Sequence, residues 1–198
     1  MADTYAYEIK GSVYINLTNE CTNKCGFCLR SRMDGVAGYN LWLEKEPTAE
    51  EVIAQMKKYS DYSEVVFCGF GEPMLRMDTL LEVARYAKST GKRVRINTNG
   101  QASLYHGRNV AKELQGLVDC VSISLNALDA ARYDALCHSI FGKKAHKAVL
   151  EFASECKKYV PEVVLSVVDI LPESEIKKCE ELAEKMGAKF RIRHYVGQ

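Results

Sequence analysis

The chain has 198 residues, enough for one domain spanning 1–198, and its 27 basic and 26 acidic side chains give a net charge of +1. This balance excludes the strongly basic surface that binding to nucleic acid or an anionic membrane requires, so we expect neither as a partner. Residues 1–10 carry no secretion signal and no apolar run reaches the roughly 18 residues of a spanning helix, which predicts a reducing, cytoplasmic location.

Strand-like and helix-like segments alternate along the chain. The expected strands lie at 12–18, 64–69, 93–98, 120–126, 162–169 and 189–194. The expected helices lie between them, at 48–59, 77–90, 106–115, 130–158 with a break near Gly142, and 173–186. Thr48, followed three residues later by Glu51, predicts a capping box at the start of the first helix. This alternation favours parallel strands with the helices on the outside.

Three of these strands alternate between apolar and polar side chains, although buried parallel strands are normally apolar on both faces. Their polar positions are Arg95, Asn97, Asn99, Ser122, Ser124, Asn126, Arg191 and Arg193. If helices cover the apolar faces, the polar faces line an interior that must hold a polar ligand and water. We therefore predict an α/β fold, a partial (β/α)6 TIM-type barrel of parallel strands that is open on one side. An antiparallel sheet with one solvated face is the alternative.

Three cysteines follow the first expected strand, in the run Cys-Thr-Asn-Lys-Cys-Gly-Phe-Cys. We call Cys21, Cys25 and Cys28 the cysteine triad. Three thiolates on one loop can hold three irons of a 4Fe–4S cluster and leave the fourth iron open to a small molecule. A zinc site completed by Cys68 or a histidine, and a disulfide, are the alternatives. The remaining cysteines are widely spaced and are expected to pack as small buried residues: Cys68, Cys120, Cys137, Cys156 and Cys179.

These features together resemble the radical S-adenosylmethionine (SAM) superfamily over nearly the whole chain. The triad matches its Cys-x3-Cys-x-aromatic-Cys motif, and Gly69-Phe70-Gly71-Glu72-Pro73 is similar to its Gly-Gly-Glu-Pro motif, with Phe70 in place of the second glycine. Thr98-Asn99-Gly100 and Ser124-Leu125-Asn126 end the next two strands, where relatives contact SAM. More narrowly, the chain resembles the short TatD-associated radical SAM family, which has no settled reaction.

The resemblance implies one 4Fe–4S cluster, bound by the triad within a cluster loop at 19–46, and no C-terminal auxiliary-cluster domain. It implies SAM contacts at Phe27, Gly71, Glu72, Thr98, Asn99, Ser124, Asn126 and Ser166. It further implies that an external reductant of the flavodoxin or ferredoxin type reduces the cluster. SAM is then cleaved to a 5′-deoxyadenosyl radical, which takes a hydrogen atom from a small-molecule or peptide substrate. A TatD-type hydrolase in the same pathway is a further expected partner.

Two other functions stay open at this stage. One is a glycyl-radical-type activase that acts on a protein partner, and the other is a non-catalytic iron–sulfur carrier or electron-transfer protein.

Polar groups near the barrel interior suggest an anionic substrate, because arginine binds carboxylates and phosphates in a two-pronged manner. The candidates for this role are Arg95, Arg191, Arg193 and His194. The alternative is that the arginines pair with acidic side chains of neighbouring loops and close the open edge of the barrel.

Overall fold

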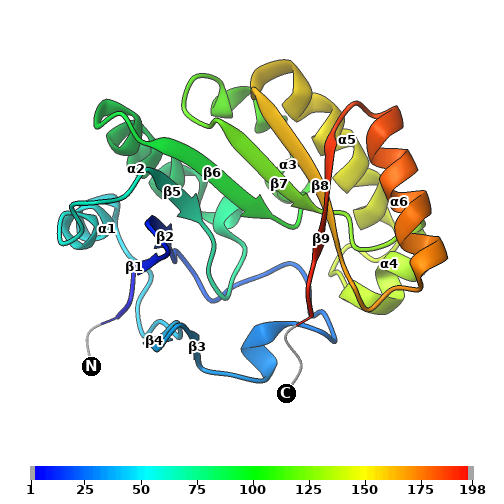
Figure 1. The fold of residues 1–198 in the computed structure, drawn as a ribbon, viewed down its shortest axis with the longest axis horizontal. Helices are drawn as coiled ribbons and strands as arrows, with labels where there is room; N and C mark the ends of the chain where they lie inside the picture. Colours follow the sequence, from blue (N-terminus) through cyan, green and yellow to red (C-terminus); the bar gives the residue numbers. More distant parts are fainter. Residues whose placement is uncertain (1–2, 196–198) are drawn as a thin grey trace.

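A curved sheet with helices on one side forms the frame of the computed structural model, which describes residues 3–195 (Figure 1). Its strands are β1 (Ala6–Ile9), β2 (Ser12–Ile15), β5 (Glu64–Phe67), β6 (Arg93–Thr98), β7 (Cys120–Ser124), β8 (Glu162–Val168) and β9 (Lys189–Arg193). They pair in that order, so β1 and β9 are the edges and the barrel stays open between them. From β2 onward all neighbours are parallel, which confirms the predicted partial barrel. The antiparallel alternative is wrong for these six strands.

The strand β1 was not predicted from the sequence. It pairs antiparallel with β2 through a two-residue turn at Lys10 and Gly11, where both φ angles are positive, at 49° and 73°. That pair of angles is typical of the type I′ turn, whose twist suits a tight hairpin. The aromatic side chains of Tyr5 and Tyr7, which sequence reasoning left without a role, are buried by this added edge strand.

Most of the predicted helices are confirmed. They are α1 (Ala49–Met56), α2 (Met77–Ser89), α4 (Ala130–Cys137), α5 (Lys144–Tyr159) and α6 (Glu173–Lys185). The capping box forms as expected, because the Thr48 hydroxyl accepts from the Glu51 amide and the Glu51 carboxylate accepts from the Thr48 amide. The predicted helix at 106–115 is wrong. The chain instead forms a short helix α3 (Ala102–His106), which ends at Gly107 with φ 64°, and a 3-10 turn η3 (Ala111–Leu114).

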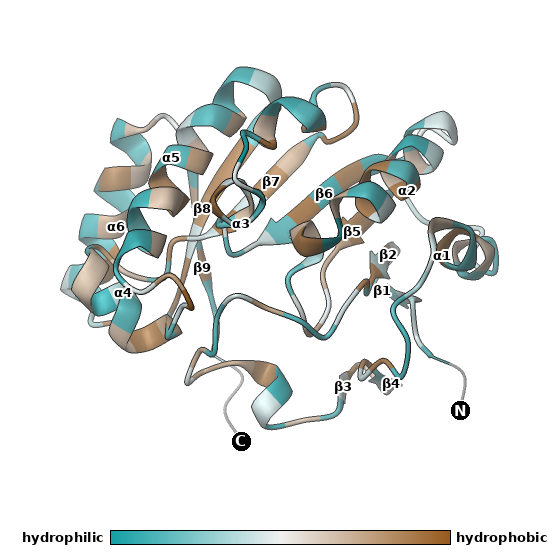
Figure 2. Cartoon of the chain, turned by 180° about the vertical axis from the view of Figure 1, so that it is seen from behind, coloured by the Kyte–Doolittle hydropathy of each residue, from teal (hydrophilic) through white to brown (hydrophobic). Residues whose placement is uncertain are grey.

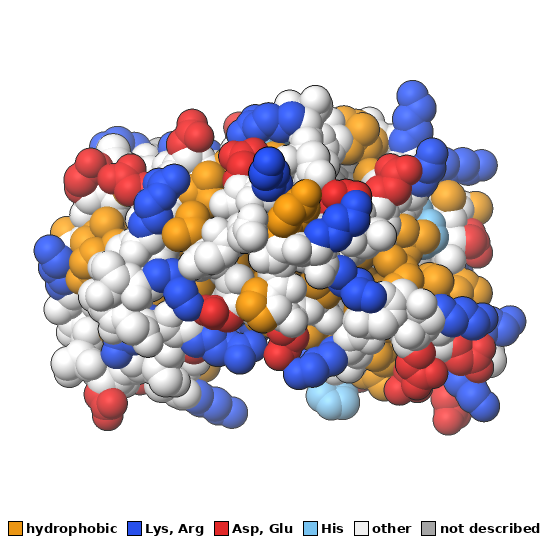
Figure 3. Space-filling model, turned by 90° about the horizontal axis from the view of Figure 1, so that it is seen from above, with side chains coloured by type: hydrophobic (Ala, Val, Ile, Leu, Met, Phe, Trp, Pro, Cys, Tyr) orange, Lys and Arg blue, Asp and Glu red, His pale blue; other side chains and the backbone are white. Residues whose placement is uncertain are grey.

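The two faces of the sheet differ as the alternation predicts. The apolar side chains on the helix-covered face are fully buried, among them Val13, Val65, Ile96, Ile123 and Leu165. Hydrophobic residues run along β7 and β8, while the surrounding helices carry both hydrophobic and hydrophilic residues (Figure 2). None of the described helices is long and apolar enough to cross a membrane. From above, Lys and Arg side chains are interspersed with Asp and Glu, as the small net charge leads one to expect (Figure 3).

The other face of the sheet is concave, and the chain between β2 and α1 crosses it (Figure 1). This segment contains the cysteine triad, a 3-10 turn η1 (Leu29–Ser31) and a small hairpin of β3 (Gly35–Val36) and β4 (Tyr39–Asn40). The middle of this segment, just after η1, approaches the residues that follow β9, where the Arg32 guanidinium lies 5.2 Å from the ring centre of Tyr195. The triad is therefore held over the carboxyl ends of the parallel strands, where ligand sites gather in β/α folds.

Candidate functional site

The end of α4 anchors the cysteine triad. The Lys24 amide donates to the Cys137 carbonyl at 2.9 Å, and the Gly26 amide donates to the Leu136 carbonyl at 3.2 Å. Carbonyls in the last turn of a helix have no partner within the helix, so they are available to hold a loop. The backbone on both sides of Cys25 is fixed in this way.

A buried network behind the triad links the loop after β6 to the cluster loop. The Gln101 side-chain amide donates to Asn23 at 2.8 Å and to the Tyr133 hydroxyl at 2.9 Å. The Ser139 hydroxyl donates to the Gln101 oxygen at 2.7 Å. Sequence reasoning missed all four residues. Gln101 directly follows the Thr98-Asn99-Gly100 run and Asn23 lies inside the triad, so their positions carried a signal, whereas Tyr133 carried none.

Asn99 connects the same network to the first triad cysteine. Its side-chain amide donates to the Thr22 hydroxyl at 2.8 Å and lies 3.7 Å from the Cys21 sulfur. Its side-chain oxygen accepts from the Gln101 amide at 3.0 Å. The structure thus gives Asn99 a role in holding the cluster loop. The contact with SAM that the resemblance implies for it stays a prediction.

Glu72 lies in the loop after β5, where its side chain meets the carboxyl end of β6, and it is 3% exposed. Its carboxylate accepts hydrogen bonds from the Thr98 hydroxyl at 2.7 Å, the Asn99 amide at 2.6 Å and the Met74 amide at 3.0 Å. Burial raises the pKa of this carboxyl to about 7, and the three hydrogen bonds oppose that rise. An ionised carboxylate has about four acceptor positions, so one remains for a ligand such as an ammonium group. Most of the hydrogen-bonding capacity of Glu72 therefore holds the ends of the strands together.

The backbone that leads into the triad leaves no room for a side chain at Gly71. A Cβ atom at this position would lie 2.3 Å from the Thr18 carbonyl oxygen and 2.5 Å from that of Glu20. The Glu72 amide also donates to the Glu20 carbonyl at 2.7 Å. The resemblance implies a SAM contact for Gly71, which stays a prediction, whereas the close neighbour of Gly71 in the structure is the segment just before Cys21. Phe70, the departure from the family motif, is buried and packs edge-on against Trp42 of the cluster loop.

The thiols of the triad are half-buried and none of them is in a disulfide. The Cys21 sulfur accepts from the Asn23 amide at 3.4 Å, a contact that opposes the rise of its pKa to about 11 on burial. Among residues 3–195, no three His, Cys, Asp or Glu side chains converge to hold a single metal ion. A 4Fe–4S cluster needs no such convergence, because each thiolate binds a separate iron. Three free thiols on one anchored loop therefore fit this cluster.

The other cysteines mostly match their expected role as small buried residues. Cys120, Cys156 and Cys179 are buried, whereas Cys68 at the end of β5 is only half-buried. Cys137 is buried too, but it has a neighbour that its sequence spacing did not indicate. Interaction between the Cys25 and Cys137 thiols raises the pKa of Cys25 and lowers that of Cys137.

The remaining predicted SAM contacts lie on the same side of the sheet. Ser124 and Ser166 are paired residues of β7 and β8, and the Ser166 hydroxyl donates to the Ile123 carbonyl at 3.3 Å. Asn126 follows β7 with φ 57°, a left-handed conformation that asparagine tolerates better than most residues. Phe27 is partly buried and packs against the core beside the triad. Their contacts with SAM stay predictions.

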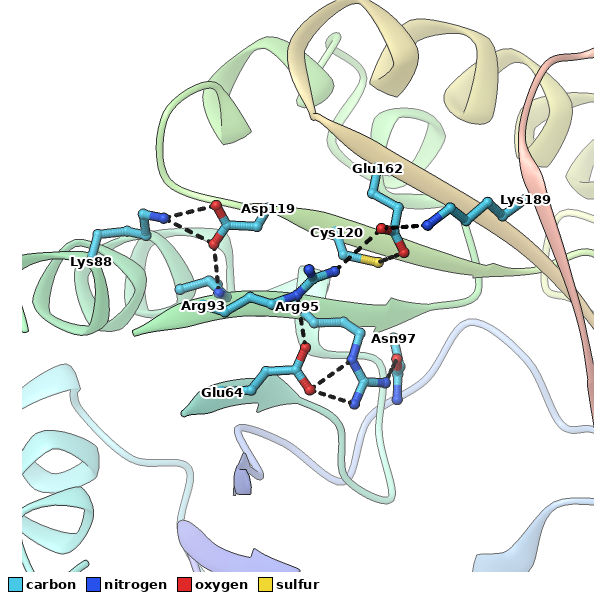
Figure 4. Close-up of polar contacts among 10 residues, drawn as sticks. Glu64, Lys88, Arg93, Arg95, Asn97, Asp119, Cys120, Glu162 and Lys189 are labelled. Atoms are coloured by element: carbon cyan, nitrogen blue, oxygen red, sulfur yellow. Dashed lines mark hydrogen bonds and ion pairs between the residues drawn. The ribbon is translucent and has the colours of Figure 1, made fainter. Parts of the chain in front are cut away.

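The four candidates for anion binding have different surroundings. Arg95 pairs with Glu64 at 3.0 Å and donates to Asn97 at 3.0 Å, so the structure supports the alternative of an internal ion pair for it (Figure 4). His194 lies 2.8 Å from Asp169 and its side chain is 91% exposed, which turns it away from the interior. Arg191 and Arg193, by contrast, form no ion pair with any acidic residue of the described chain.

Comparison with known proteins supports one family. The model of the Radical SAM superfamily matches residues 15–186. The chain is 32% identical over 182 residues to a "Probable GTP 3′,8-cyclase" of Thermococcus kodakarensis, covering 90% of this chain and 54% of that protein. It is 27% identical over 157 residues to a "Putative glycyl-radical enzyme activating enzyme" of Methanocaldococcus jannaschii, covering 78% of this chain and 60% of that protein. The chain therefore spans between half and two thirds of the length of these two relatives.

The fold is also similar to that of solved structures. The structure of Streptococcus suis SuiB bound to the precursor peptide SuiA matches with a TM-score of 0.66 at 16% identity, covering 96% of this chain and 40% of SuiB. SuiB bound to S-adenosylmethionine matches with a TM-score of 0.62 at 17% identity, covering 92% of this chain and 38% of that one. At this level of identity the likeness concerns the fold alone.

Proposed function

The chain belongs to the Radical SAM superfamily, whose members use a 4Fe–4S cluster and SAM, and we propose that it is an enzyme that reductively cleaves SAM. The cysteine triad would hold one 4Fe–4S cluster. The observation that carries this proposal is the anchoring of the triad, at once by the end of α4 and by the buried network of Asn99 and Gln101. The triad also lies near a concave sheet face with polar side chains, which a carrier protein that binds no substrate would not need.

The bound cluster and SAM would supply a one-electron cleavage of the sulfonium carbon–sulfur bond, yielding methionine and a 5′-deoxyadenosyl radical that takes a hydrogen atom from the substrate. The chain itself would position the reactants and limit access of water. Glu72 and Asn99 would keep the strand ends and the cluster loop in register. Ser124, Asn126 and Ser166 would offer polar groups to SAM. The electron would come from an external protein of the flavodoxin or ferredoxin type.

The finer identity of the reaction is a separate question. An activase acting on a protein partner is the second candidate, favoured by the likeness to the archaeal protein named as a glycyl-radical enzyme activating enzyme. The open edge between β1 and β9 leaves room for such a partner. Membership of the TatD-associated family, a TatD-type hydrolase as partner and a cytoplasmic location are parts of the same proposal.

Reduced, cluster-loaded protein should convert SAM to 5′-deoxyadenosine slowly even without its substrate, because the cleavage needs only the cluster, an electron and bound SAM. The product is measured by chromatography after anaerobic incubation with a chemical reductant. Protein with Cys28→Ala serves as the control and should yield none. If the wild-type protein carries a full cluster and forms no 5′-deoxyadenosine, the result favours the carrier function and the enzyme proposal is wrong.

A further inference from the structure

Three cationic side chains project in a row from the edge strand β9 on the concave face of the sheet. Lys189, Arg191 and Arg193 are alternate residues, so their side chains point to the same side of the sheet. The Lys189 ammonium is neutralised by Glu162 at 2.9 Å. The two arginines have no carboxylate of the described chain within ion-pairing distance. The row therefore carries a surplus of two positive charges beside the opening of the barrel.

A hollow of about 310 Å³ opens beside this row at the amino ends of the strands. Its walls include four cationic side chains and two carboxylates, and the hydroxyl of Ser122. Both carboxylates are already engaged, because Glu64 binds Arg93 and Arg95, and Glu162 binds Lys189 (Figure 4). The hollow lies near the small end of the range for ligand sites, about 300–1,000 Å³. It suits a small molecule with negative charge.

One hydrogen-bond donor of the Arg193 guanidinium has no acceptor. One guanidinium nitrogen, Nη2, donates to the Asn126 side-chain oxygen at 2.7 Å, whereas the buried Nε has no partner. Burial lowers the pKa of this guanidinium, and the nearby Arg191 lowers it further. A buried donor without an acceptor costs free energy, and so does the repulsion between two cations. An oxyanion placed between the two arginines would relieve both costs at once.

We propose that Arg191 and Arg193 together bind a carboxylate or phosphate group of a small anionic substrate. Arg191 would reach this group from the wall of the hollow, and Arg193, which does not line the hollow, from the carboxyl end of β9. The inference rests on the proposed function, because it places the substrate on the concave face beside SAM. Arg95 takes no part, since Glu64 neutralises it. Arg191 lies two residues before Arg193, nearer the amino end of β9, so a group held by both sits deeper than the cluster loop. That depth favours the substrate over the carboxylate of SAM as the occupant.

The test is a calorimetric titration of anaerobically reconstituted, unreduced protein in the presence of saturating SAM. Citrate is the carboxylate probe and inorganic pyrophosphate is the phosphate probe, and the tighter of the two identifies the chemistry. Arg193→Gln and Arg191→Gln should each weaken that binding by about tenfold or more, the effect typical of losing a hydrogen bond between charged groups. Arg85→Gln, at an exposed position of α2, should leave it unchanged. If neither probe binds at millimolar concentration, or if all three variants bind alike, the proposal is wrong.

Two further readouts separate this role from its rivals. If Arg191→Gln or Arg193→Gln instead abolishes binding of SAM, the arginines hold SAM and the proposal is overturned. The bound probe should raise the melting temperature of the wild-type protein but not of Arg193→Gln. Without a probe, Arg193→Gln should melt close to wild type, because removing a buried charge without an ion-pair partner offsets the loss of its hydrogen bond to Asn126. A large drop would make the arginine structural. Because the titration uses unreduced protein, a failure of SAM cleavage would sink the proposed function without altering this result.

Discussion

Replacing Cys25 with alanine should abolish the iron–sulfur cluster, and so should the same change at Cys21 or Cys28. Thiolates are the only protein anchors that such a cluster has in this loop, so two of them cannot retain it. Iron and sulfide are assayed per chain after anaerobic reconstitution. Wild-type protein should carry about four irons, as one 4Fe–4S cluster requires. Each triad variant should carry close to none while keeping the circular dichroism of the folded wild type.

Cysteines outside the triad provide the matched controls. Cys120→Ala and Cys179→Ala remove buried thiols far from the loop and should keep the full iron content. Cys137→Ala is the sharper control, because the Cys137 thiol interacts with the thiol of Cys25. It should also keep the cluster. Iron lost from this variant would make Cys137 a fourth ligand, which would leave no open iron and contradict the proposed reaction.

Replacing Gly71 with alanine should destabilise the fold and lower cluster occupancy together. The new methyl group would meet the carbonyl oxygens of Thr18 and Glu20 at 2.3 and 2.5 Å, and backbone cannot rotate away as a flexible side chain can. Overpacking of this kind costs about 1–3 kcal/mol and sometimes more, and we expect the upper end of that range. The measurements are urea unfolding and the iron content after reconstitution.

Gly26 is the control for this substitution, because it lies inside the triad and an added Cβ would meet nothing within 4 Å. Gly26→Ala should leave both stability and iron content near those of wild type. If Gly71→Ala behaves the same way, the account of this motif as a support for the cluster loop is wrong.

The parallel strands and their helices could be predicted because their signals are local. The alternation of Ser122 and Ser124 with buried neighbours, and the capping pair of Thr48 and Glu51, each act within a few residues. The strand β1 was missed because its signal lies in pairing with β2, through a turn at Lys10 where glycine or asparagine would have been the usual sign. The helix expected at 106–115 failed because Gly107 ends the preceding turn in a left-handed conformation.

The residues of the candidate site could be predicted from the sequence only in part. The triad is contiguous in sequence and could be found directly. The network that holds it joins residues more than 30 positions apart, such as Gln101 with Tyr133 and Asn23 with Gln101, and pairing at that distance leaves no local pattern. The motif resemblance predicted a SAM contact for two residues but did not reveal their structural role. Glu72 and Asn99 were expected to face SAM, while the structure shows how much of their hydrogen bonding supports the fold itself.

The electron paramagnetic resonance spectrum of the reduced cluster, recorded with and without SAM, tests the central claim most directly. If the triad binds three irons and leaves the fourth open, SAM that binds this iron should shift the g values of the cluster signal. The Cys120→Ala protein should show the same shift, because its thiol lies outside the triad. A wild-type spectrum that SAM leaves unchanged, in protein with a complete cluster, would contradict the account.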